Sequence, residues 1–215
     1  VSEWSEARAF WITTSARLVT DEAMGLTIRA SRTGTSVPWP IESPTIPAMN
    51  VVVCVKQIPD PADPGALDPG TKTLKRDVKL ILDESDTYGV EMALQLVDKA
   101  GEGSVHLVSM APNNERSGLA TALAMGAASA TLISDPALLG SDALTTAKLL
   151  AAAIAERDGI DLVISGSESS DGYTGTVPTQ IAAVLDLPSI TAAKAITVDG
   201  GQVQIQRQTN AGYDD

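Results

Sequence analysis

The chain has 215 residues, 44% of them hydrophobic, so a single domain with extensions can bury a sizeable core. Its formal net charge of −12 argues against nucleic acid or an anionic membrane surface as the main partner. One cysteine, Cys54, and one histidine, His106, exclude an intrachain disulfide and offer too few ligands for zinc. With no apolar run of about 18 residues and no signal peptide in the sequence, we expect a cytoplasmic protein without membrane insertion.

Residues 1–48 differ in composition from the rest of the chain. They contain all three tryptophans and the only phenylalanine, have no lysine, and end in the Pro/Ser-rich stretch SVPWPIESPTIPA. No convincing strand or helix stands out in this segment. We interpret it as a disordered N-terminal extension, with translation naturally beginning at Met49, and take residues 49–215 as the domain.

After Met49, short apolar runs alternate with helical patterns. The run NVVVCV at 50–55 is continuous and β-branched, which is typical of a strand buried on both faces. Further along, Val90, Ala93, Leu94 and Val97 follow helical spacing. The expected elements are a loop at 60–70, helices at 86–100, 115–125, 142–157 and 178–185, strands at 105–110, 130–135 and 161–166, and a polar loop at 167–177.

This alternation predicts an α/β fold with a mostly parallel sheet and helices on both faces, of the Rossmann-like kind that binds adenine nucleotides. The tail departs from it. Runs at 190–198 and 202–208 flank Asp199-Gly200-Gly201, which predicts a C-terminal β-hairpin.

Ligands of open parallel sheets bind beyond the carboxyl ends of the strands. The loop from Gly166 to Thr176 is the most informative of these ends, because its glycines and hydroxyls precede a helix and suit a phosphate. An ordinary surface loop explains it equally well. Lys56, after the first strand, either meets a phosphate or is solvated, and the solvated interpretation is favoured. Cys54 is interpreted as a packed small side chain and His106 as a strand residue.

The sequence lacks the motifs of two enzyme classes. No GxGxxG follows the first strand, and no GxxxxGK[ST] occurs, so a hydride-transferring dehydrogenase and a P-loop NTPase are both disfavoured. No carboxylate pair has a spacing suited to general acid–base catalysis.

Four stretches resemble the beta subunit of electron transfer flavoproteins: VVVCVKQIPDP, TALAMGAASATLI, DLVISGSESSDGYTGTVPTQIA and QVQIQRQTNAGY. The resemblance covers about 49–215. It implies a heterodimer in which an alpha subunit holds most of the FAD and the beta subunit binds AMP. The resemblance also implies an electron carrier that is not itself an enzyme. It also implies electron transport from flavin dehydrogenases, such as acyl-CoA dehydrogenases of fatty acid beta-oxidation, to a quinone oxidoreductase.

The resemblance also implies the cofactor-binding residues. They follow the first strand, precede the first helix, follow the second strand and form the loop after the fourth. They are Cys54, Asp83, Glu84, Ser85, Asp86, Met110, Gly166, Ser167, Glu168, Ser169, Ser170, Asp171, Gly172, Tyr173, Thr174, Gly175, Thr176 and Val177. Family members often read Asn-Pro-Phe-Cys where this chain reads Asp-Glu-Ser-Asp.

Alternatives stay open at this point. Family members continue beyond the equivalent of Tyr213 with further strands and an arm, so the domain is interpreted as C-terminally truncated. In a bifurcating branch of the family, a second FAD replaces AMP. Outside the family, a stand-alone ATP-binding module of the universal-stress kind has the same layout, and an adenylating ligase is a more distant possibility.

Overall fold

The computed structural model describes residues 10–14, 48–62, 67–199 and 202–214. Within them, one eight-stranded sheet has the order β10-β9-β8-β1-β7-β2-β5-β6, and β3 and β4 form a separate antiparallel pair. The strands are β1 Phe10–Thr14, β2 Met49–Cys54, β3 Gln57–Pro59, β4 Leu80–Leu82, β5 Gly103–Met110, β6 Ser129–Ile133, β7 Leu162–Gly166, β8 Ser189–Asp199, β9 Gln202–Thr209 and β10 Gly212–Asp214.

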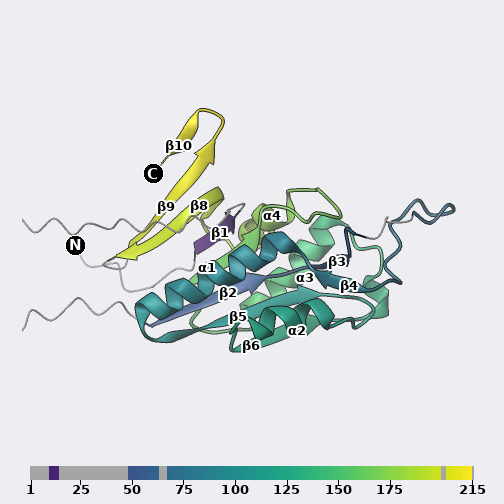
Figure 1. Ribbon diagram of the computed structural model, residues 1–215, viewed down its shortest axis with the longest axis horizontal. Coiled ribbons are helices and arrows are strands. Elements are labelled where there is room, and N and C mark those ends of the chain that lie inside the picture. Colours follow the sequence, from purple (N-terminus) through teal and green to yellow (C-terminus); the bar gives the residue numbers. More distant parts are fainter. Residues whose placement is uncertain (1–9, 15–47, 63–66, 200–201, 215) are drawn as a thin grey trace, which may run out of the picture.

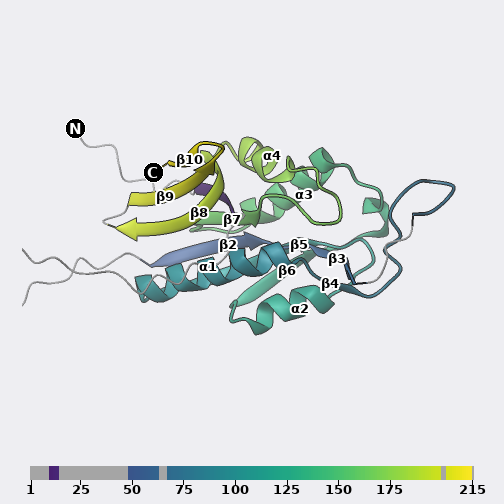
Figure 2. The same cartoon turned by 45° about the horizontal axis from the view of Figure 1, so that its top comes forward.

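Helices cover both faces of the parallel part of this sheet (Figures 1 and 2). They are α1 Glu84–Ala100, α2 Ser117–Ala124, α3 Ala143–Ala155 and α4 Val177–Val184, with a short 3-10 helix at Pro136–Leu138. The pairs β1–β7, β1–β8, β7–β2, β2–β5 and β5–β6 are all parallel. The predicted α/β fold is therefore confirmed.

Strand β2 shows why its sequence is continuously apolar. Val51 and Val53 pack into a core layer with α1 and α2, whereas Val52 and Cys54 pack into a second layer with α3 and α4. Both faces of the strand are thus buried, and each fully buried Val contributes roughly 1.5–3 kcal/mol. Because β2 lies at the centre of the parallel strands, the two layers meet there.

The predicted C-terminal hairpin is also present. Strands β8 and β9 pair antiparallel from Asp199↔Gln202 to Ala193↔Arg207, and the expected turn residues 200–201 lie outside the described residues. A third strand, β10, adds to the edge of β9 and was not predicted. It is only three residues long and rich in turn formers, so its pairing comes from its neighbour and not from its own pattern.

Strand β1 differs from the expectation for residues 1–48. Phe10–Thr14 lies between β7 and β8, with Ile12 opposite Ile164 on one side and Ile190 on the other. The remainder of that segment, up to residue 47, lies outside the described residues. A five-residue strand paired on both sides takes its stability from partners far along the chain, which a local pattern does not reveal.

Strands β3 and β4 were also missed. They pair across residues 60–79, where Pro, Asp and Gly indicate only a loop. Among the described residues, none of the helices combines the length and the apolar character needed to cross a membrane.

Candidate functional site

The carboxyl ends of three strands meet at one edge of the sheet. Strand β2 is hydrogen-bonded to β5 on one side and to β7 on the other, with Cys54 opposite Val108 and Ser165. The chain runs from β2 outward to β5 and β6, and then returns to β7 on the opposite side of β2. The gap between β2 and β7 is therefore the point where strand order reverses, which is where open α/β sheets bind ligands.

Asp83 joins the first helix to the loop after β7. Its Oδ1 accepts from Ser85 N at 3.1 Å and Ser85 Oγ at 2.9 Å, which caps α1. Its Oδ2 accepts from Ser170 N at 2.8 Å and Ser170 Oγ at 2.9 Å. The Asp83 residue is 1% exposed, so both oxygens of a buried carboxylate are used by the chain itself.

Asp86 lies one turn further along α1 and is also buried. Its Oδ2 accepts from Lys56 N at 2.6 Å, and the Gly166 N–H donates to the same carboxyl group. Burial raises the pKa of Asp86 to about 8, against the lowering effect of these two donors. The buried Asp86 carboxyl thus connects the end of β2, through Lys56, with the end of β7, through Gly166.

Cys54 is buried at the same edge. Burial, followed by the nearby Asp86 charge, raises the pKa of its thiol above the ordinary value. The thiolate, which is the reactive form, is therefore disfavoured. Cys54 packs with Val52 and Ile181 in the α3–α4 layer, so it is a packed small side chain, as expected.

Asp171 forms a second connection, to two cationic side chains from other segments. Its Oδ1 accepts from Lys56 Nζ at 2.7 Å, and its Oδ2 accepts from Arg76 Nη2. Lys56 Nζ also donates to Ser169 Oγ at 2.9 Å. Burial acts to raise the pKa of Asp171, but the hydrogen bond and charge of Lys56 and the charge of Arg76 together lower it below the usual value. Asp171 is consequently ionised at neutral pH.

The rest of the loop is open to solvent. Residues 172–176 are exposed, and Tyr173 and Gly175 adopt positive φ angles of 50° and 61°. Tyr173 N donates to Ser169 O at 2.9 Å, which closes a turn. Helix α4 then begins with no side-chain cap at Thr176, so its first N–H groups are not satisfied by a capping side chain. Such a helix start attracts anions.

The expected cofactor-binding residues therefore fall into three groups. Cys54, Asp83, Asp86 and Gly166 are buried beneath the edge. Those that are half-buried are Ser85, Met110, Ser167, Ser169, Ser170, Asp171 and Val177, while Glu84, Glu168, Gly172, Tyr173, Thr174, Gly175 and Thr176 are exposed. The structure brings the first helix, the end of β2 and the β7 loop together; Met110 packs at the margin of the α3–α4 layer.

The pairing of Lys56 and Arg76 with Asp171 was not predicted from sequence. The Lys56 side chain is 40% exposed, and its ammonium group is paired with Asp171. Nothing in the sequence indicates that Arg76 contacts Asp171, because 95 positions separate the two residues. The basic run around Arg76 suggests only a solvated loop. In the structure, the loop that ends at β4 carries Arg76 to the edge of the sheet.

His106 has the structural role expected of it. Its Nδ1 lies 2.6 Å from Ser129 Oγ and its Nε2 lies 2.9 Å from Thr131 Oγ1, both on the neighbouring strand β6. Burial and then the charge of Arg157 lower the pKa of His106 to about 4. With both ring nitrogens facing hydroxyl groups of the sheet, His106 is not arranged as the base of a Ser-His-Asp triad.

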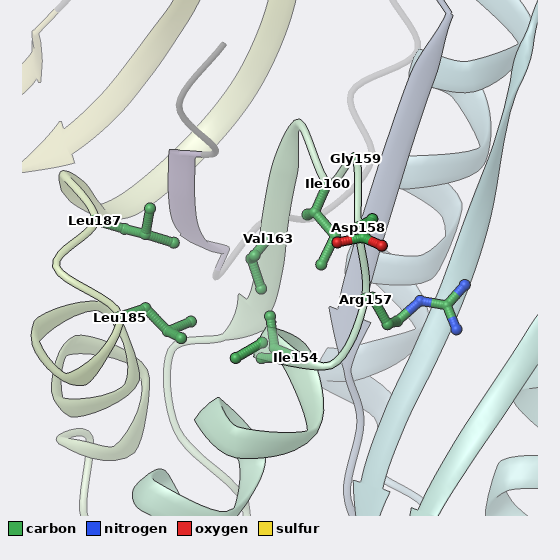
Figure 3. A pocket seen from close by; sticks show the side chains of 9 residues that line it. Ile154, Arg157, Asp158, Gly159, Ile160, Val163, Leu185 and Leu187 are labelled. Carbon is green, nitrogen blue, oxygen red and sulfur yellow. The ribbon is translucent and has the colours of Figure 1, made fainter. Parts of the chain in front are cut away.

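A cavity of about 270 Å³ lies near the opposite end of β7 (Figure 3). The side chains of Ile154, Val163, Leu185 and Leu187 line it, and Arg157 points away from them. A second hollow of about 420 Å³ lies between β4 and the starts of α1 and α2. The loop after β7 lines neither of these two hollows. The candidate site is the polar edge between β2 and β7, because strand order reverses there.

Fold and site define the class of protein: a doubly wound α/β domain with a polar, glycine-containing loop at the point of strand reversal. A family model, electron transfer flavoprotein domain, matches residues 71–214. The chain is 38% identical over 168 residues to electron transfer flavoprotein subunit beta of Mycobacterium tuberculosis, covering 76% of this chain. It is 40% identical over 172 residues to the subunit of that name from Megasphaera elsdenii, covering 77% of this chain.

A third relative is subunit CarD of the caffeyl-CoA reductase-Etf complex of Acetobacterium woodii, 36% identical over 167 residues and 77% of this chain. This chain belongs to the electron transfer flavoprotein family, and its relatives place it with the beta subunits. It spans 63% of the length of each of these three curated relatives.

Proposed function

We propose that this domain is one subunit of an electron-carrier heterodimer and that it binds AMP at the edge between β2 and β7. The observation that carries the proposal is the loop after β7, which is anchored at Ser170 by Asp83 and then leads, exposed, into an uncapped helix. Phosphate is held in this way by backbone N–H groups and hydroxyls, without a lysine-rich pocket. That solution suits a chain of net charge −12.

The loop after β7 presents exposed residues where a phosphate would approach. Gly172 is exposed, and a side chain there would begin 3.1 Å from Ser169 Oγ, so the loop backbone is accessible where a phosphate would approach. Hydroxyls from Ser167, Thr174 and Thr176 stand in the same loop. Asp83 and Asp86 supply no ligand atoms in this proposal, because their oxygens already accept bonds from the chain; they hold the loop and the strand ends in place.

The redox chemistry belongs to FAD, which we propose is mostly held by an alpha subunit of the same family and which carries electrons when bound. Residues 172–176 of the loop are exposed, which is consistent with a site completed by a second chain. We further propose that the pair accepts electrons from flavin dehydrogenases, such as those of fatty acid beta-oxidation, and passes them to a quinone oxidoreductase.

The partner oxidoreductase is the least constrained part of this proposal. One relative is named as a subunit of a caffeyl-CoA reductase-Etf complex, so a reductase of that kind is a second candidate partner. A second FAD in place of AMP is the corresponding variation at the nucleotide site.

The test is co-expression of this chain with alpha subunits of the family, followed by denaturation and chromatography of the released nucleotides. One AMP and one FAD per two-chain complex supports the proposal. Two FAD per complex places the chain in the bifurcating branch. ATP from a homodimer identifies a universal-stress-type module instead, and the absence of any nucleotide in every combination contradicts the proposal.

A further inference from the structure

Three consecutive residues anchor the first half of the β7 loop. Ser169 accepts from Lys56, Ser170 donates to Asp83, and the Asp171 carboxylate pairs with Lys56 and Arg76. The Asp171 side chain is only 5% exposed, although residues 172–176, which follow it, are exposed. The loop therefore has an anchored half and an open half.

Both cations at this site are already committed to the chain. The Lys56 ammonium group donates to two atoms of the loop, at 2.7 Å and 2.9 Å, and Arg76 takes the other oxygen of Asp171. A phosphate bound by the same two cations would lie beside the Asp171 carboxylate, and like charges at such a distance repel each other. The exposed hydroxyls of Thr174 and Thr176 and the uncapped start of α4 offer a phosphate donors that are not paired with Asp171.

We propose that Lys56 and Arg76 are positioning residues that act through Asp171: they hold the loop in the form that binds nucleotide, and they do not bind the phosphate themselves. This inference rests on the proposed nucleotide-binding function. It makes the loop around residues 67–79 a determinant of nucleotide affinity, because Arg76 connects that loop to the nucleotide loop across 95 positions of sequence.

A double-mutant cycle with AMP as the probe tests the proposal in the full chain. Asp171→Asn and Arg76→Met should each weaken AMP binding by about tenfold, and the double variant should bind no more weakly than Asp171→Asn alone, because the two residues form one coupled pair. Losses that multiply in the double variant overturn the proposal, since they mean that Arg76 contacts the phosphate directly. Lys75→Met is the matched control: it removes an exposed positive charge from the adjacent position and should leave the affinity unchanged.

Hydrogen exchange provides a readout that needs no nucleotide. The amides of Gly172 and Tyr173, which donate to Ser169 O, should exchange faster in Asp171→Asn and Arg76→Met, to the same extent in the double variant, and at the wild-type rate in Lys75→Met. Arg76→Lys, which keeps a cation, should restore most of the protection. Unchanged exchange in both single variants overturns the inference.

Failure of the proposed nucleotide binding and failure of the positioning role give different results. If the wild-type chain and its complex with an alpha subunit bind neither AMP nor FAD, the proposed function fails and this inference fails with it. If the wild type binds AMP but the losses in the cycle multiply, only the positioning role is overturned.

Discussion

At Gly172, an added methyl group would lie 3.1 Å from Ser169 Oγ and 3.6 Å from Lys56 Nζ. The first distance is tight, and both neighbours are flexible side-chain ends, so a small residue is tolerated there. A larger side chain would instead project over the anchored half of the loop. Backbone conformation does not require glycine at this position, since its φ lies outside the left-handed region.

Gly172→Trp should therefore abolish AMP binding while the fold persists, because the indole occupies the approach to the loop backbone. Binding is measured by calorimetry and the fold by a circular dichroism melt, in which we expect the midpoint to move by no more than about 3 °C, as for an exposed surface change. Gly172→Ala is the control and should retain most of the affinity. A large drop in the melting midpoint of the Trp variant would show that the loop has a structural role instead.

Among the elements, β1 joins two parts of the sheet. It is the strand between β7 and β8, so it links the hairpin strands to the parallel core. β1 is paired with a parallel strand on each side. A proline, which cannot donate a ladder hydrogen bond, is tolerated on edge strands and not in such a position.

Ile12→Pro should destabilise the domain, because the ring removes a ladder N–H from a strand that is paired on both sides. We expect a loss of about 2–3 kcal/mol in the free energy of unfolding, measured by urea titration, comparable to other backbone disruptions. Ala48→Pro is the control, since Ala48 is exposed and precedes β2. Equal stability of Ile12→Pro and the wild type would mean that β1 does not hold its place in the sheet in solution.

The pH dependence of stability is a property of the whole molecule, and two buried groups shape it in opposite directions. Asp86 has a folded-state pKa raised to about 8, so the folded state keeps a proton between pH 4 and 8 that the unfolded state releases. The stabilisation of the folded state by protonated Asp86 is thus largest at low pH and is lost as pH rises toward 8. His106 has a folded-state pKa of about 4, so it costs stability as pH falls from about 6.5 toward 4.

Between pH 6.5 and 8, Asp86 has the larger effect, because the His106 imidazole of the unfolded state, with its ordinary pKa of about 6.5, loses its remaining proton in the lower part of this range. The wild type should lose free energy of unfolding as pH rises through this range, and Asp86→Asn should be flatter, because Asn has no proton to release and still offers an oxygen to Lys56 N. Urea titrations at several pH values measure the slope. Glu84→Gln, an exposed change in the same turn, should keep the wild-type slope. An identical slope in Asp86→Asn and the wild type would mean that Asp86 is ionised throughout.

Sequence alone determined most of the parallel core. Continuous apolar runs such as 50–55 and the helical spacing of Val90 and Ala93 are local consequences of burial on both faces of a sheet, so the parallel strands and the α-helices from β2 to α4 could be read in order, whereas the short pair β3–β4 could not. The hairpin β8–β9 followed from its turn residues. For the candidate site, the rule that ligands bind at strand carboxyl ends selected the loop after β7 without any coordinates.

Only the tertiary structure decided where β1 lies and what the charged side chains do. Short strands such as β1 and β10 take their stability from partners distant in sequence, and no local period marks them. The pairing of Asp171 with Arg76 depends on a loop folding back across the sheet edge, and the two hydrogen-bonded oxygens of Asp83 depend on α1 meeting the β7 loop. Charge pairs carry no sequence periodicity, because they need proximity in space alone.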